Sequence, residues 1–188
     1  VHVLSVSLSS KLAVFSGNVT FWPVDATLDN YRFVMRDSQF FRAYGVTLVR
    51  VAIGWAISMT LLVLAGYPLS LPRDRFGGKN IFTWFFVFTM LFNGGMIPTY
   101  LIVKSTGLID TIWALVIPGC LSTFNLILMM NYFKTLPSAL YEAAYIDGAD
   151  HMTTLIKIVL PLSLPALASI SLFVIMGHWN DYFSGMIY

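Results

Sequence analysis

The chain has 188 residues, of which 57% are hydrophobic and only 11% are charged. Soluble domains carry about 25% charged residues, so this chain has too few charges to cover a water-exposed surface, and we expect a polytopic membrane protein. The net charge of +2 is too small to indicate nucleic-acid binding, the single cysteine excludes an intrachain disulfide, and the three scattered histidines lack metal-ligand spacing.

The first 42 residues begin with an apolar stretch, which we interpret as the end of a first membrane helix that is cut away upstream. Further on, apolar side chains recur at near-helical spacing at Leu28, Tyr31, Val34, Met35 and Phe41. This pattern predicts a helix that lies in the membrane interface, with Asp25 or Thr27 near its start. An ordinary ordered loop is the open alternative.

Four later stretches are long enough to cross a bilayer, which takes about 20 apolar residues. They cover residues 43–66, 81–103, 111–133 and 159–179. Because backbone N–H and C=O groups find no water in lipid, these stretches must be helical. The sequence therefore predicts an all-α fold with four transmembrane helices.

Three features interrupt the apolar spans. Arg50 is the only Lys, Arg, Asp or Glu well inside one, and we expect its side chain to extend to the interface; a partner on another helix and a role in a substrate pathway are the alternatives. Residues 93–98 (NGGMIP) and the pair Pro118-Gly119 interrupt the second and third spans. Close helix packing is the favoured explanation, although broken helices also line transport pathways.

Polar side chains within or beside the spans are candidates for a substrate pathway: Asn93, Asn125, Asn180 and Asp181. Hydrogen bonds between helices are the favoured explanation for the first two. An anchor at the membrane surface beside Trp179 is the favoured explanation for the last two. The chain has no G-x4-G-K-[ST] phosphate-binding loop, so we expect no ATPase activity and no cofactor in it.

The connection 134–158 is longer and more polar than the others. Pro137 suits a first helical turn, Gly148 lies where a glycine ends a helix, and Asp150 is a plausible N-cap for a second helix. These residues predict a short helix, a glycine turn and a second helix. A hairpin that binds a partner and an interfacial hairpin without one are both compatible with this pattern.

The spacing within this connection is more specific. The fixed positions are Glu142, Ala143, Ala144, Gly148, Ile158, Leu160 and Pro161. They resemble the EAA signature (E-A-A-x3-G-x9-I-x-L-P) of permease subunits of ATP-binding-cassette importers, a match expected by chance on the order of once in 10⁸ starting points at average residue usage. Residues 93–119, 125–150 and 177–183 are most similar to the carbohydrate-uptake branch of that family.

The resemblance implies a MetI-like permease fold with six transmembrane helices and cytoplasmic termini. The four predicted spans would be helices two to five of the six, with helices one and six missing from this chain. The loop 134–158 would be cytoplasmic, and most of residues 1–42 would be extracytoplasmic. The resemblance also implies a location in the bacterial inner membrane.

The resemblance further implies that the first short helix of this loop docks into an ATPase subunit. The residues expected to couple the two subunits are Glu142, Ala143, Ala144, Asp147 and Gly148. Expected partners are ATPase subunits, a second similar permease subunit, an extracellular sugar-binding protein and the lipid bilayer, and the expected function is carbohydrate import. An importer of a non-sugar substrate and a membrane scaffold protein are the alternatives.

Overall fold

The computed structural model describes residues 1–188 and contains helices and loops without strands, which confirms the all-α prediction. The chain forms two compact units, residues 1–48 and 49–188. The first unit contains α1 (His2–Ser7), α2 (Lys11–Phe15), α3 (Asp29–Arg36) and the beginning of α4 (Ser38–Ser70). The second contains the rest of α4 and the later helices, in chain order α5 (Lys79–Leu91), α6 (Met96–Ser105), α7 (Ile112–Val116), η1 (Ile117–Gly119), α8 (Thr123–Thr135), α9 (Ser138–Ile146), α10 (His151–Thr154), η2 (Leu155–Val159), α11 (Leu160–Leu162), α12 (Leu164–Asn180) and α13 (Tyr182–Ile187).

The helix predicted in the first unit is present as α3. The hydroxyl of Thr27 accepts a hydrogen bond from the backbone N–H of Asp29, the first residue of α3, at 3.2 Å. Thr27 is one of the two residues that were expected near the start of this helix. The Asp37 carboxylate then accepts the N–H of Gln39 at 2.9 Å and begins α4. The location of α3 in a membrane interface stays a prediction.

One helix of the chain, α4, is by itself long and apolar enough to cross a membrane. Three pairs of helices reach that length and hydrophobicity only together, and each pair is bent at its junction. The bends are 114° between α5 and α6, 52° between the segment 112–119 and α8, and 83° between the segment 151–162 and the segment 164–187. The number of membrane spans therefore stays a prediction.

The breaks occur where the sequence weakens a helix. After α5, the amide oxygen of Asn93 accepts the N–H of Gly95 at 2.9 Å, and Gly95 has a φ of +85°, which favours glycine. Pro118 lies in the 3-10 helix η1, and its ring cannot donate a backbone hydrogen bond. The ranges 81–103 and 111–133 are therefore broken helices. A Cβ at Gly95 or Gly119 would meet no atom within 4 Å, so these two glycines do not serve close helix packing, which was the favoured explanation.

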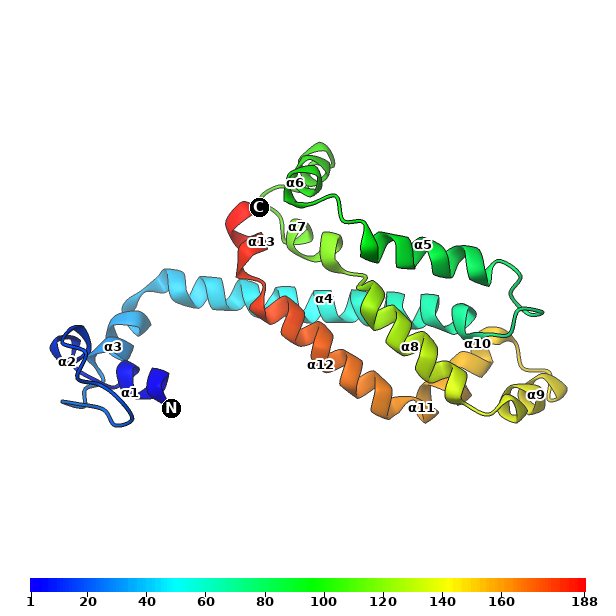
Figure 1. The fold of residues 1–188 in the computed structure, drawn as a ribbon, viewed down its shortest axis with the longest axis horizontal. Coiled ribbons are helices and arrows are strands. Elements are labelled where there is room, and N and C mark those ends of the chain that lie inside the picture. Colours follow the sequence, from blue (N-terminus) through cyan, green and yellow to red (C-terminus); the bar gives the residue numbers. More distant parts are fainter. The chain divides into compact units, whose positions relative to one another are not determined.

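The core of the second unit joins α4, α8 and α12. Fully buried side chains come from α4 (Leu62), α8 (Phe133) and the π-helical segment η2 (Val159), and they belong to one apolar cluster with Ile170 and Val174 of α12. Helix α8 packs against both α12 and α5, and α8 and α12 run side by side (Figure 1). This packing holds α9 beyond the C-terminal end of α8 (Figure 1).

Candidate functional site

The predicted helix–turn–helix is present between residues 137 and 162. Pro137 is the N-cap of α9, one position before the first helical turn. At the other end, the N–H of Gly148 bonds to the carbonyl of Tyr145 at 3.1 Å, and the N–H of Ala149 bonds to that of Ala144 at 2.9 Å. With Gly148 at a φ of +78°, these two bonds form a Schellman motif that ends the helix.

Asp150 is the N-cap of α10, as predicted. Its carboxylate accepts the backbone N–H of Thr153 at 3.0 Å, and its carbonyl accepts the hydroxyl of Thr154 at 2.9 Å. The hydrogen bonds from Thr153 hold the pKa of the Asp150 carboxyl below its usual range, because they stabilise the charged form. The hairpin is therefore fixed at both ends of its turn by local hydrogen bonds.

The outward face of α9 carries most of the residues expected to bind a partner. Glu142, Ala143 and Asp147 are exposed along one side of the helix, and so is Gly148 in the turn. The same face presents Ile146, which is 86% exposed and lies four residues after Glu142, on the same side of the helix. Sequence reasoning missed Ile146, although its helical spacing from Glu142 was visible.

Ala144 lies on the opposite face of α9. It is 4% exposed and is covered by the chain itself. Ala144 therefore faces its own chain here, and its expected part in admitting a partner stays a prediction. Its small side chain lets α9 pack closely against its own chain, while Ala143 remains available at the outward face.

A cluster of aromatic and basic side chains attaches this hairpin to the rest of the second unit. The guanidinium of Arg75 lies over the ring of Tyr145, 4.3 Å from its centroid. The hydroxyl of Tyr145 lies 2.8 Å from Nδ1 of His151, and the hydroxyl of Tyr67 in α4 lies 3.5 Å from the same nitrogen. Arg75, Tyr145, His151 and Tyr67 thus connect α4, the loop after it and both arms of the hairpin. Nothing in their spacing along the sequence indicated this cluster.

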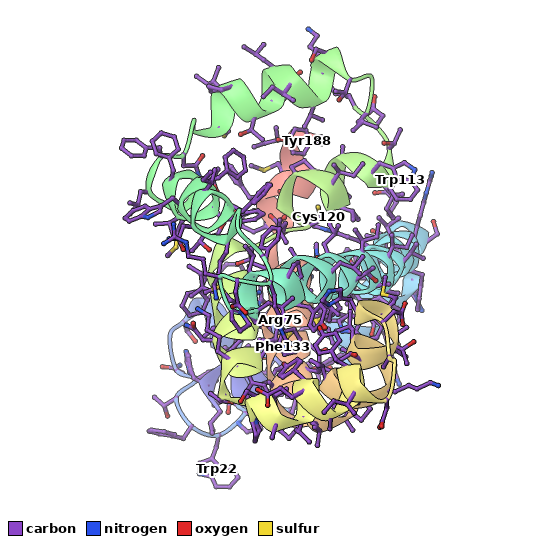
Figure 2. The ribbon with its side chains drawn as sticks, turned by 90° about the vertical axis from the view of Figure 1, so that its right-hand side faces the viewer. Trp22, Arg75, Trp113, Cys120, Phe133 and Tyr188 are labelled. Atoms are coloured by element: carbon purple, nitrogen blue, oxygen red, sulfur yellow. The ribbon has the colours of Figure 1, made fainter.

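A cavity of about 270 Å³ lies between α9 and the loop that follows α4. Arg75, Lys134 and Glu142 line it together with Phe133, and Figure 2 shows the labelled Arg75 and Phe133 near one another in a view from the side of α9. Tyr141 also lines the cavity, and burial raises the pKa of its hydroxyl. Charged groups of both signs are therefore available beside the outward face of α9.

Arg50, inside the first predicted span, pairs with Asp181, which lies just beyond the fourth. Its guanidinium bonds to both the carboxylate and the backbone carbonyl of Asp181, and Arg50 is only 5% exposed. The guanidinium thus has a carboxylate partner at the junction of α12 and α13, and whether this pair lies at the membrane interface stays a prediction. The pairing between helices that sequence reasoning kept as an alternative is the observed arrangement.

The four candidate pathway residues separate into two groups. Asn125 and Asp181 line one cavity of about 330 Å³, together with Ser58 and His178. Asn93 bonds to Gly95 at the break after α5, and Asn180 is exposed at the end of α12. Neither lines this cavity.

Comparisons with known proteins cover most of the chain. A family model described as "Binding-protein-dependent transport system inner membrane component" matches residues 57–187. The chain is 43% identical over 188 residues to the polygalacturonan/rhamnogalacturonan transport system permease protein YtcP of Bacillus subtilis (strain 168), covering 100% of this chain and 65% of that protein. It is 37% identical over 187 residues to protein LplC of the same organism, covering 100% of this chain and 63% of that protein.

A solved structure has the same fold. A chain from a bacterial ABC transporter involved in the import of the acidic polysaccharide alginate matches with a TM-score of 0.88 and 37% identity. The match covers 96% of this chain and 64% of that one. The chain thus spans slightly less than two thirds of the length of YtcP, of LplC and of that structure.

Proposed function

The chain belongs to the family of binding-protein-dependent transport system inner membrane components and shares its MetI-like permease fold, and from this premise we propose that it is a permease subunit of an ATP-driven carbohydrate importer. The names of two similar proteins support oligo- or polysaccharide-derived substrates, because one transports polygalacturonan or rhamnogalacturonan and the other alginate. These names favour sugars over the non-sugar alternative.

The observation that carries the proposal is the outward face of α9. It combines an exposed carboxylate at Glu142, the small Ala143 and the exposed apolar Ile146 on one rigid helix. An exposed anchor of this kind on a capped helix is suited to insertion into a groove of another protein. We assign that groove to an ATPase subunit, where Glu142 pairs with a basic group.

The cluster around His151 gives a route by which movement of α9 reaches the membrane helices. Arg75 and Tyr145 hold α9 to the loop after α4, and Tyr67 connects His151 to α4 itself. Because α4 contributes to the core shared with α8 and α12, a displacement of the hairpin is transmitted to those helices as a unit. ATP binding and hydrolysis by the partner then drive alternating access.

The chain itself hydrolyses no ATP under this proposal. Its partners are a pair of ATPase subunits, a second similar permease subunit and an extracellular sugar-binding protein, within the lipid bilayer. The residues that contact the ATPase are Glu142, Ala143, Ile146 and Asp147, with Gly148 shaping the turn behind them.

Purification of the full-length protein in mild detergent tests the assembly. We expect an ATPase, a second permease and a saccharide-binding protein to co-purify, with each identified by mass spectrometry. In reconstituted vesicles the saccharide should stimulate ATP hydrolysis. Stable binding of a soluble partner without stimulated hydrolysis or uptake would instead support a membrane scaffold.

A charge reversal tests the docking face. Glu142→Lys should abolish uptake and ATPase co-purification while the protein still inserts in the membrane. The matched control is Asp29→Lys, because Asp29 is also exposed and its ion pair with Arg32 is a surface pair that contributes little. Normal uptake by the Glu142→Lys protein would refute the docking role.

A further inference from the structure

Three buried polar side chains face one cavity without a hydrogen-bond partner. Ser58 of α4, Asn125 of α8 and His178 of α12 are 2%, 7% and 8% exposed and line the 330 Å³ cavity. Their side-chain polar atoms bond to no other protein group. They are not among the fully enclosed unpaired atoms, which are Arg50 Nε and Ser163 Oγ, so they can be reached from the cavity. Because most polar side chains in the protein interior are paired, three that are reachable from the same space are available to bond a ligand or water there.

The cavity presents donors and acceptors without a net charge. A serine hydroxyl donates and accepts, a carboxamide offers two donors and an acceptor, and a neutral imidazole offers one of each. Asp181 adds a carboxylate, and the buried Arg50 already neutralises it. A free ion would therefore meet no uncompensated charge, whereas a molecule with several hydroxyl groups would find a partner for each.

The other walls of the cavity fit the same class of ligand. Phe173 lines it and is half exposed, which provides an apolar surface against which the C–H face of a sugar ring can lie. The volume of about 330 Å³ is at the lower end of the roughly 300–1,000 Å³ typical of small-molecule sites. Polar groups inside membrane spans commonly mark a substrate pathway.

Glycines keep this space open. A side chain at Gly177 would meet no atom within 4 Å, and Gly177 lines the cavity. At Gly54, by contrast, an added Cβ would lie 2.6 Å from Nε2 of His178. Gly54 thus allows the imidazole to lie where it borders the cavity, and Gly177 leaves the volume empty.

We propose that this cavity is a binding subsite for a hydroxyl-rich sugar unit, with Ser58, Asn125, His178 and Asp181 as its hydrogen-bonding groups. The inference rests on the proposed function as a carbohydrate permease and deepens it, because it assigns substrate contacts to this subunit. The sugar unit bonds through its hydroxyl groups, and its carboxylate, if it has one, is not required.

Transport kinetics of the assembled importer in vesicles test the subsite. The probes are trigalacturonate and maltotriose, supplied separately with the saccharide-binding protein. Asn125→Leu should raise the KM of the imported probe about 10-fold or more, as loss of a bond to a substrate hydroxyl does. Gly177→Leu should block uptake by filling the cavity. The matched controls are Asn131→Leu, on an exposed position of the same helix, and Gly45→Leu, whose added side chain also meets open space.

The single cysteine provides a second measurement on the unmodified protein. Cys120 lines the same cavity, so bound saccharide should slow its alkylation by N-ethylmaleimide several-fold during turnover, as followed by peptide mass spectrometry. This readout does not depend on the folding of a variant.

The outcomes separate the subsite from the proposed function. If the wild-type importer moves neither probe, the carbohydrate function itself fails. If it moves a probe while Asn125→Leu and Gly177→Leu keep the wild-type KM and Cys120 is not protected, the cavity holds water only and the subsite is refuted.

Discussion

The guanidinium of Arg50 in α4 and the carboxylate of Asp181 after α12 form an ion pair between residues 131 positions apart in the chain. The pair links the two helices at one end of the polar cavity that Asp181 lines. Asp181 also accepts the backbone N–H of Ser184 at 3.1 Å and so begins α13. One carboxylate thus fixes both the contact with α4 and the turn between α12 and α13.

Removal of one member of this pair should destabilise the fold more than removal of both. Arg50→Met leaves the Asp181 carboxylate without its partner, and Asp181→Leu leaves a buried guanidinium uncompensated. Asp181→Leu should cost the most, about 3–5 kcal/mol, the range for leaving one buried charge unpaired. Arg50→Met should cost less, because the Asp181 side chain is 34% exposed and water can solvate it. The double variant should recover a large part of that loss. Thermal unfolding in detergent measures all three, and additive losses in the double variant would show that the two residues do not interact.

Gly148 should be required for the shape of the hairpin. Its φ of +78° is unfavourable for a residue with a Cβ, although an added Cβ would meet no atom within 4 Å. Gly148→Ala should therefore destabilise the turn by about 1–2 kcal/mol through backbone strain alone. Amide hydrogen exchange over residues 142–151 should become faster. Gly77→Ala is the matched control, because that position is equally open and has no left-handed φ.

The hairpin was predictable because its determinants are local. Pro137, Gly148 and Asp150 act through hydrogen bonds to groups only a few residues away, so their spacing along the chain suffices to place both helices. The start of α3 beside Thr27 was predictable for the same reason.

Other features depend on contacts that the sequence does not encode by spacing. The pairing of Arg50 with Asp181 requires α4 and α12 to be neighbours in space. The burial of Ala144 depends on which face of α9 turns inward, and two adjacent alanines look alike in the sequence. The interruptions at residues 93–98 and at Pro118-Gly119 were visible, whereas the size of the bends, 114° and 52°, does not follow from the spacing of residues.

The hydroxyl of Tyr145 should contribute to coupling through its contact with His151. Tyr145→Phe removes the 2.8 Å contact with Nδ1 of His151 but keeps a ring beneath Arg75. Loss of one such hydrogen bond should increase local opening of the hairpin about 2- to 10-fold, as measured by amide hydrogen exchange. We also expect less saccharide imported per ATP hydrolysed in reconstituted vesicles.

Two further variants distinguish the effect of the Tyr145 hydrogen bond from that of its aromatic ring. Tyr145→Ala removes both contacts and should reduce the amount of saccharide imported per ATP hydrolysed more strongly. Tyr182→Phe is the control, because that tyrosine is exposed in α13 and its loss should leave the ratio unchanged. A Tyr145→Phe protein with the wild-type ratio of import to hydrolysis would show that the hydroxyl has no part in coupling.

The cap at Asp150 should make the second arm of the hairpin sensitive to acid. Hydrogen bonds from Thr153 lower the pKa of this carboxyl in the folded protein, so the ionised form stabilises the fold at any pH above the unfolded pKa of about 3.9. That contribution is lost as the pH falls from about 4 through the folded pKa. The protection of the amides of residues 151–154, which is the intrinsic exchange rate divided by the observed rate at the same pH, should therefore decrease below about pH 4 in the wild type.

Two substitutions at Asp150 distinguish this titration from general acid unfolding. Asp150→Asn keeps an acceptor for the N–H of Thr153 and cannot titrate, so the protection of residues 151–154 should lose its acid dependence while remaining high. Asp150→Ala removes the acceptor and should lower this protection at every pH, because the first N–H groups of the helix lose their N-cap partner. An unchanged acid response in the Asp150→Asn protein would assign the effect to another group.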